Sequence, residues 1–156
     1  MEVTPATAFN GPLRVSAANP RYFTDDSGTA RYLTGSHTWA VMQDMWLEGA
    51  PRRPTDYDGF LQMMADNGHN FLRFWSWMQT RNANWSETPT HFDPQPFARS
   101  GPGLANHGLP RFDLARWNDD YFARLRERVE QAGQKGIYVS VMLSETWAIK
   151  WATPAT

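Results

Sequence analysis

The chain has 156 residues, which is enough for one ordinary domain with one hydrophobic core. Its 15 basic and 16 acidic side chains give a net charge of −1, so there is no electrostatic basis for binding nucleic acid or an anionic membrane. The absence of cysteine excludes disulfides, thiolate metal sites and cysteine nucleophiles. The chain has no apolar run of the roughly 20 residues that span a membrane, and its first residues lack the pattern of a secretory signal. As written, the chain is expected in the cytoplasm.

Residues 14–35 predict short strands joined by a tight turn at residues 25–28, where the sequence reads DDSG. We therefore expect residues 1–30 to form a lead-in with a β-hairpin. The strand predicted at residues 31–35 runs into the polar and aromatic stretch SHTW at residues 36–39.

Residues 55–68 predict a helix. Thr55 is the expected N-cap, Asp58 follows three residues later as in a capping box, and Gly68 is the expected terminator. Apolar residues recur at the i, i+3, i+4, i+7 spacing of a core-facing helix. This segment is therefore expected to cover one face of a sheet.

Residues 118–135 predict a second helix, which Asn118 caps. Its apolar stripe again has helical spacing. We expect its charged residues to form a solvated face and not a binding patch; these are Arg124, Arg126, Glu127, Arg128 and Glu130.

Residues 70–75 and 137–143 are continuously apolar except for Arg73, which is typical of buried strands in a parallel sheet. Residues 76–117 are rich in proline, glycine and aromatics, and a loop of that length usually carries function. A short helical turn is predicted near residues 112–116.

The order is therefore strand, helix, strand, helix, strand. Short turns that contain glycine precede the strands, and longer segments rich in polar and aromatic residues follow them. This asymmetry predicts a functional rim at the carboxyl ends of parallel strands. The first strand is followed by GSHTWA, so the sequence lacks a dinucleotide fingerprint there, and it has no P-loop.

The stretches NPRYFTDDSGTARYLTGSHTW, NGHNFLRFWSW, FARSGPG and GIYVSVMLSETW resemble the N-terminal part of cellulase-like glycoside hydrolases of clan A, most of all the apiosidase-like group. The resemblance runs from about residue 10 to residue 148. It implies an α/β fold, a (β/α)8 TIM barrel, with a catalytic acid/base after strand four and a nucleophile after strand seven. The implied activity is hydrolysis of O-glycosyl bonds in a complex or plant-type polysaccharide, with retention of configuration.

An eight-fold barrel needs about 250 residues. Residues 31–156 would then be its first three strands and two helices, and the catalytic carboxylates would lie beyond residue 156. The chain would be an N-terminal fragment that is inactive alone, whose partner is the missing half of the barrel or a second copy. The resemblance also implies that full-length relatives are secreted or periplasmic.

The resemblance places Arg73 on strand two, under the active site, where it would hydrogen-bond the nucleophilic carboxylate. A fixed guanidinium keeps a carboxylate ionised and oriented, as a nucleophile requires. The alternative is a structural salt bridge at the rim. In this chain alone, Arg73 should lack its carboxylate.

Further substrate-binding residues are predicted from their places after strands. Exposed indoles in clefts can stack on flat sugar faces, although indoles also plug loops against the protein body. Trp75 and Trp77 alternate with a serine and should point the same way, into the cleft. His37 has a structural alternative of equal weight. The complete predicted set is His37, Trp39, Arg73, Trp75, Trp77, Gln79, Glu145 and Trp147.

Glu145 is the carboxylate that directly follows a predicted strand, beside an indole that could raise its pKa as suits a general acid. We expect it mainly to support substrate binding, and it is a weak catalytic candidate. Glycoside hydrolysis needs a second carboxyl group, for which Asp44, Glu87 and Asp93 are candidates.

The histidines at 69, 91 and 107 lack metal-ligand spacing, so we predict no metal and no cofactor. Two alternatives to a glycoside hydrolase stay open. One is a non-catalytic carbohydrate-binding or interaction module, and the other is an inert remnant of a truncated gene.

Overall fold

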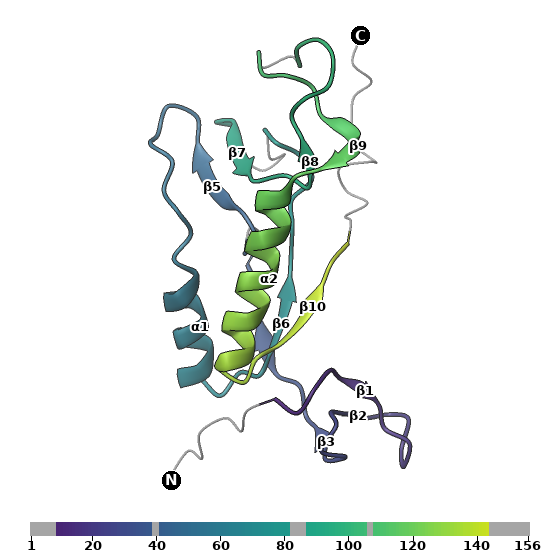
Figure 1. The fold of residues 1–156 in the computed structure, drawn as a ribbon. Helices are drawn as coiled ribbons and strands as arrows, with labels where there is room; N and C mark the ends of the chain where they lie inside the picture. The colour runs from purple at the N-terminus through teal and green to yellow at the C-terminus, as the bar shows by residue number, and fades with distance from the viewer. Residues whose placement is uncertain (1–8, 39–40, 82–86, 106–107, 144–156) are drawn as a thin grey trace.

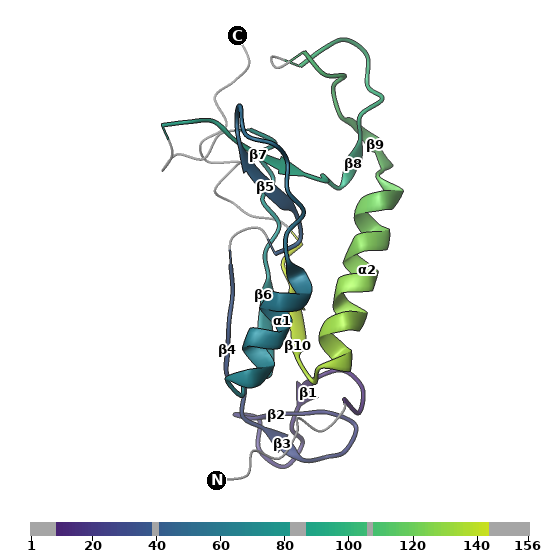
Figure 2. The same cartoon turned by 90° about the vertical axis from the view of Figure 1, so that its left-hand side faces the viewer.

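The computed structural model describes residues 9–38, 41–81, 87–105 and 108–143 (Figure 1). In these residues two helices lie against one face of a small parallel sheet. An antiparallel sheet lies at one end of this layer, and two antiparallel strand pairs lie at the other (Figures 1 and 2). None of the helices in the described part of the chain has the length and apolar character needed to cross a membrane.

The lead-in is a three-stranded antiparallel sheet of order β1-β2-β3. Its strands are β1 (Arg14–Val15), β2 (Phe23–Thr24) and β3 (Ala30–Arg31). The predicted turn is confirmed: Gly28 has φ +73°, and its N–H donates to the Asp25 carbonyl at 3.0 Å. The turn thus lies where it was predicted, between β2 and β3 of this three-stranded sheet.

The Asp25 carboxylate ties this lead-in to the parallel sheet. Ser27 donates to it from both its hydroxyl and its N–H, the Tyr138 hydroxyl donates at 2.8 Å, and Arg31 forms an ion pair at 2.8 Å. Hydrogen bonding from Ser27, then from Tyr138 and Arg31, outweighs burial and holds the pKa of Asp25 well below its usual range. Because the aspartate is buried, the tie is part of the fold and not a surface contact.

The parallel sheet has the order β10-β6-β4. Helix α1 (Tyr57–Asp66) connects β4 (Gly35–Ser36) to β6 (Phe71–Phe74), and α2 (Asp119–Gln134) connects β6 to β10 (Tyr138–Val141). The two helices and strands β6 and β10 lie where the apolar patterns predict them, whereas β4 overlaps the strand predicted at residues 31–35 only at Gly35, and Arg31 belongs to β3. The strands are shorter than predicted.

Strands β4 and β6 approach so closely that only glycine fits at position 35. A Cβ built on Gly35 would lie 1.6 Å from the carbonyl oxygen of Phe71, its partner in the ladder. Thr34 and Asn70 hold the strands together there through several hydrogen bonds, including Asn70 N–H to the Thr34 carbonyl at 2.8 Å.

The main core lies between the sheet and the helices. Leu72 and Phe74 of β6 point into it, and α1 contributes Leu61 and Met64. These side chains are almost fully buried, at about 1.5–3 kcal/mol of hydrophobic stabilisation each. The helix-facing side of β6 is therefore the core side.

Helix α1 begins one residue later than its predicted cap. Asp56, not Thr55, is the N-cap, and its carboxylate accepts from Gly59 N–H at 2.9 Å. Thr55 instead bonds back to the preceding segment, with its N–H on Asp44 and its hydroxyl on the Gln43 carbonyl. In α2 the predicted cap is confirmed, because the Asn118 side chain accepts from the second N–H after it.

One residue of the predicted solvated face of α2 is buried. Arg128 is 7% exposed, with its guanidinium 4.7 Å from the Tyr57 ring centroid, and it donates to the Val41 carbonyl. Arg124 is also not simply solvated, because it pairs with Asp44 at 3.2 Å.

The segment expected as one long loop contains most of two antiparallel pairs. Strand β5 (Asp44–Leu47) pairs with β7 (Thr90–Asp93), and β8 (Phe97–Ala98) pairs with β9 (Asp113–Trp117). The predicted helical turn near residues 112–116 is wrong, since β9 occupies those residues.

The prediction of three consecutive units of a (β/α)8 TIM barrel is wrong. In the described residues the strands form four separate sheets, of which three are antiparallel, and only two helices are present. Continuous apolar runs correctly indicated buried parallel strands, but that pattern is the same in any small sheet covered by helices. It carries no information on how many further units follow or how the sheet closes.

Candidate functional site

The candidate site lies on the face of the parallel sheet away from the helices, which we call the open face. Side chains alternate across a strand, so Arg73 faces away from the core that receives Leu72 and Phe74. Arg73 is exposed, whereas both of its neighbours are buried. The strand thus keeps its arginine out of the core.

Three residues that follow or end parallel strands converge with Arg73. The His37 and Trp75 rings stack with centroids 6.2 Å apart and an interplanar angle of 17°. The Arg73 guanidinium carbon lies 5.3 Å from the Trp75 ring centroid, and its Nη2 lies 3.7 Å from the Met142 Sδ. We call His37, Arg73, Trp75 and Met142 the open-face cluster.

The ladder explains this convergence. Arg73 pairs with Ser140 of β10, and Leu72 pairs with Ser36 of β4. The residue after β4, His37, and the residue after β10, Met142, therefore lie beside the end of β6. The rim predicted at the carboxyl ends of the parallel strands brings these side chains together.

Electrostatically, the cluster is a lone cation beside an indole. Within the described residues Arg73 forms no ion pair with a carboxylate. A guanidinium beside an indole face is stabilised by about 0.5–2 kcal/mol. Its remaining N–H donors suit oxygen atoms of a ligand, whether hydroxyl or carboxylate.

Trp77 differs from the expectation that it points into a cleft beside Trp75. It is 1% exposed and packs on Phe92, with ring centroids 5.4 Å apart, and Trp75 packs against this pair. Trp77 therefore has no exposed face for a ligand. Gln79 is partly buried, and its carbonyl accepts a long hydrogen bond from Gln95 at 3.5 Å.

Sequence reasoning missed the residue that fixes this tryptophan. Gln43 is fully buried, accepts from Trp77 N–H at 2.6 Å, and donates to the carbonyls of Trp77 and Pro94 at 2.8 and 3.1 Å. The only signal was a polar residue within the apolar stretch AVMQ.

Three predicted site residues lie outside the described residues: Trp39, Glu145 and Trp147. Their roles in binding, and that of Glu145 in catalysis, stay predictions.

Two of the other acidic candidates are engaged in ion pairs. Arg52 contacts Asp44 at 2.7 Å and Asp93 at 2.7 Å, and Asp44 is also paired with Arg124. Burial raises the pKa of Asp44, but the hydrogen bonds from Arg52 and Thr55 and the charge of Arg124 hold it below its ordinary value. An ionised, buried carboxylate is a poor proton donor.

The third candidate, Glu87, is exposed on the surface. Within the described residues, no group of three or more histidine, aspartate or glutamate side chains is placed to hold a metal ion.

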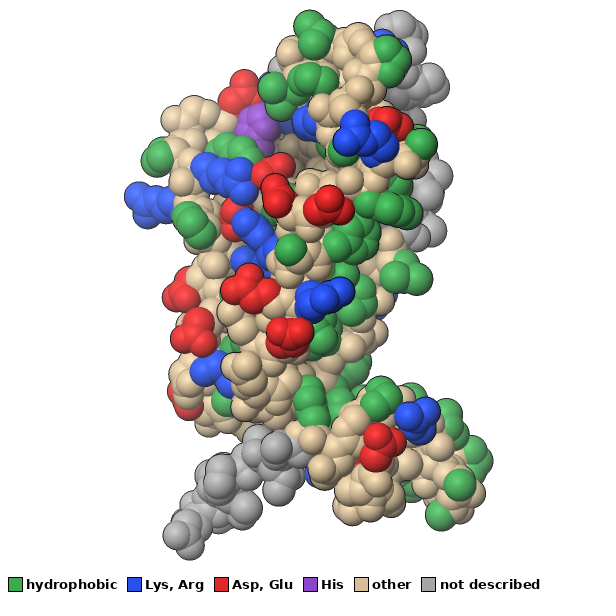
Figure 3. Space-filling model, viewed as in Figure 1, with side chains coloured by type: hydrophobic (Ala, Val, Ile, Leu, Met, Phe, Trp, Pro, Cys, Tyr) green, Lys and Arg blue, Asp and Glu red, His purple; other side chains and the backbone are tan. Residues whose placement is uncertain are grey.

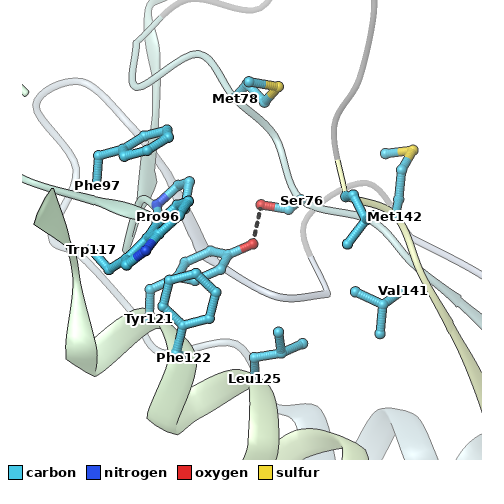
Figure 4. A pocket seen from close by; sticks show the side chains of 11 residues that line it. Ser76, Met78, Pro96, Phe97, Trp117, Tyr121, Phe122, Leu125, Val141 and Met142 are labelled. Atoms are coloured by element: carbon cyan, nitrogen blue, oxygen red, sulfur yellow. Dashed lines mark hydrogen bonds between the residues drawn. The ribbon is translucent and has the colours of Figure 1, made fainter. Parts of the chain in front are cut away.

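An apolar pocket of about 340 Å³ opens on the helix side of the same strand ends (Figure 4). Trp117, Phe122 and Met142 line it, and its polar feature is a hydrogen bond of 3.0 Å from the Tyr121 hydroxyl to Ser76. Figure 3 shows apolar side chains gathered along the side of α2 that faces β10. Because these two hydroxyl groups already hydrogen-bond to each other, the pocket offers little to a polar ligand.

Comparisons with known proteins give one family and one solved structure. The family described as Domain of unknown function (DUF6298) matches residues 79–145, less than half of the chain. No curated protein matches the chain. A crystal structure of a protein from Bacteroides vulgatus ATCC 8482, provisionally assigned as a glycoside hydrolase, is similar with a TM-score of 0.63 and 18% sequence identity.

The likeness is one of fold. The alignment covers 92% of this chain but 25% of that protein, so this chain spans a quarter of its length. The resemblance to glycoside hydrolases is thus supported at the level of fold, without a specific clan or group.

Proposed function

We propose that this chain is part of a glycoside hydrolase-type protein and that its open-face cluster binds saccharide. The observation that carries the proposal is the convergence of His37 and Arg73 on Trp75 at the carboxyl ends of parallel strands. The fold likeness to a provisional glycoside hydrolase supports it.

The chemistry of the cluster suits a sugar ring. A partly exposed indole offers an apolar surface to the C–H face of a pyranose, and the guanidinium offers fixed N–H donors to its oxygens. The His37 imidazole can donate or accept beside them. A guanidinium offers N–H donors and no acceptor, so Arg73 would bind and position substrate, and the acid/base chemistry of hydrolysis would fall to carboxyl groups.

Hydrolysis of an O-glycosyl bond in a complex or plant-type polysaccharide would then require two carboxyl groups outside the cluster. Glu145 remains the weak candidate within this chain, and Arg73 is placed to orient a second carboxylate. Arg73 is an exposed cation that pairs with no carboxylate among the residues the structure describes, which is consistent with that role.

The test is a titration of intrinsic tryptophan fluorescence with neutral cello-, xylo- and arabino-oligosaccharides. Trp75→Ala should weaken binding by about tenfold, which corresponds to the loss of one aromatic contact of about 1.5 kcal/mol. Trp117→Ala is the matched control, because Trp117 is 62% exposed but lies on the helix side of the sheet. Equal losses in the two variants would contradict the proposal.

Arg73→Ala should weaken binding as Trp75→Ala does, whereas Arg126→Ala, an exposed arginine on α2, should not. If neither Arg73→Ala nor Trp75→Ala changes the affinity of a saccharide that binds, the open-face cluster is not its site.

A non-catalytic carbohydrate-binding module is the second candidate. It is favoured by the ion-paired state of Asp44 and Asp93, which leaves the cluster without a proton donor among these two residues. Release of reducing sugar separates the two functions. Hydrolysis that Glu145→Gln abolishes supports the enzyme, whereas binding without hydrolysis by the whole protein of which this chain is part supports the module.

A further inference from the structure

A second cavity lies on the antiparallel pair β5–β7, beyond the aromatic pair of Trp77 and Phe92. It has a volume of about 240 Å³ and mixes apolar with polar side chains. Figure 3 shows basic, acidic and histidine side chains gathered over this part of the molecule. The residues important here are Trp46, Thr80, Phe92, Asp93, Arg52 and Arg99.

The charged lining has a net positive charge, because two arginines face one carboxylate. Arg52 is fully engaged, since it bridges Asp44 and Asp93 and lies 5.2 Å from the Trp46 ring centroid. Asp93 is therefore neutralised within the protein. The charge that remains is that of Arg99.

Arg99 is partly desolvated and lacks a carboxylate partner among the described residues. Its guanidinium lies 4.0 Å from the Phe112 ring centroid, and its Nη1 donates to the Pro110 carbonyl at 3.0 Å. Burial lowers the pKa of Arg99, and the charge of Asp93 opposes this only in part. These two contacts hold the planar donor group in place and leave other N–H groups for a ligand.

We propose that this cavity is a saccharide subsite for an acidic sugar, a hexuronate, whose carboxylate pairs with Arg99. Leu109, which is 48% exposed, and Trp46, whose ring stacks on His91 with centroids 5.3 Å apart, supply the apolar wall. Asp93 and Thr80 lie where ring hydroxyls can be bound. Arginine suits a carboxylate because its fork of donors matches the two oxygens. The inference rests on the proposed saccharide-binding function and deepens it.

The cavity and the open face are connected through packed aromatic residues. Phe92 lines the cavity, packs on Trp77, and belongs to the same apolar cluster as Trp75 of the open face. The neutral and acidic subsites thus adjoin one aromatic cluster. The open-face cluster would bind a neighbouring sugar of the same polysaccharide.

The experiment compares D-glucuronate with D-glucose, which differ in having a carboxylate or a hydroxymethyl group. Ligand-observed NMR titrations of the whole chain at millimolar sugar should show about tenfold tighter binding of glucuronate, as expected for one charge-assisted hydrogen-bonded pair. The preference should shrink when the salt concentration is raised, whereas glucose binding should not change.

Three variants test the residue. Arg99→Gln should abolish the preference for glucuronate, and Arg99→Lys should retain part of it. Arg116→Gln is the matched control and should keep the full preference, because Arg116 is an exposed arginine on β9 that donates to the Ser100 hydroxyl at 3.3 Å. Circular dichroism melts establish that each variant is folded.

The outcomes separate this inference from the proposed function. Binding of neutral oligosaccharides without a preference for glucuronate overturns the acidic subsite alone. A preference that survives Arg99→Gln overturns it as well. A glucuronate preference that Arg99→Gln abolishes, in a protein whose binding ignores Arg73→Ala and Trp75→Ala, supports the subsite and overturns the open-face cluster. Failure to bind any saccharide overturns both.

Discussion

Replacing Gly35 by alanine should both destabilise the fold and weaken saccharide binding. The added Cβ would lie 1.6 Å from the Phe71 carbonyl oxygen, whereas non-bonded heavy atoms normally lie about 3.5 Å apart. The obstacle is backbone, which cannot rotate away as a side chain can. Strand β4 must therefore move from β6 by about 2 Å, and His37 must move with it.

The magnitude follows from two contributions. Overpacking against a rigid neighbour costs about 1–3 kcal/mol. A displacement of this size also breaks one or two of the hydrogen bonds between Thr34 and residues 70–71, each worth about 1 kcal/mol. The expected loss is about 2–5 kcal/mol of unfolding free energy, or roughly 4–20 °C in melting temperature for a chain of this size.

The assay is urea denaturation followed by circular dichroism, with Gly28→Ala as the matched control. Gly28 has φ +73° but has no atom within 4 Å of its added Cβ, so that variant should lose only the roughly 1–2 kcal/mol of left-handed strain. A loss in Gly35→Ala no larger than that in Gly28→Ala would refute the close approach of β4 and β6. Weaker oligosaccharide binding by the folded Gly35→Ala protein is the functional counterpart.

Three further predictions concern single side chains. Hydrogen bonds hold the pKa of Asp25 below its unfolded value of about 3.9, so the stability that they contribute is present above that pH and is lost as the pH falls. The melting temperature of Asp25→Asn should therefore fall less than that of wild type between pH 5 and pH 3. Asp26→Asn, at an exposed position, should behave as wild type. Gln43→Leu leaves the buried Trp77 N–H and the Pro94 carbonyl without their partner, whereas the Trp77 carbonyl keeps its hydrogen bond from Gln95 at 3.1 Å. Urea denaturation should therefore show a loss of about 2 kcal/mol, and a loss under 0.5 kcal/mol would contradict the burial of this amide. Asp56→Ala should cost about 1 kcal/mol of unfolding free energy, because it removes the N-cap of α1. Asp58→Ala should cost clearly less, since the Asp58 side chain is 84% exposed, and a larger loss in Asp58→Ala would contradict Asp56 as the cap.

The helices and the parallel strands were predictable because their signals are local. Periodicity located both helices, and Asn118 and Gly68 marked ends that the structure confirms, with Gly68 at φ +69°. The choice between Thr55 and Asp56 as cap was not decidable locally, since the buried Asp44 and Gln43 recruit the threonine.

Long-range contacts account for most of what the sequence did not reveal. The charge of Arg128 and its position on the helix predicted a solvated side chain. In the structure its guanidinium lies over the Tyr57 ring, 71 residues away in sequence, and donates to the Val41 carbonyl, 87 residues away. The closure of the sheet was likewise not encoded in strand composition, so the barrel was inferred from resemblance.

The site was partly predictable for the same reason. His37, Arg73 and Trp75 each follow or end a strand, and the parallel ladder alone brings them together. Trp77 obeyed the same alternation but is turned inward, because Gln43 fixes its backbone against the β5–β7 segment. The cavity at Arg99 depends on the pairing of β5 with β7, which no local sequence pattern predicted.

The tie between Asp25 and Tyr138 also sets an order of events during synthesis. Its two partners are 113 residues apart, and ribosomes add about 5–20 residues per second, so the hairpin emerges roughly 6–23 s before the strand it binds. Over that interval the Asp25 carboxylate lacks the hydrogen bond that the Tyr138 hydroxyl donates. The lead-in is therefore fixed to the parallel sheet only once β10 has been synthesised. A nascent chain stalled before Tyr138 should have a lead-in that is sensitive to protease.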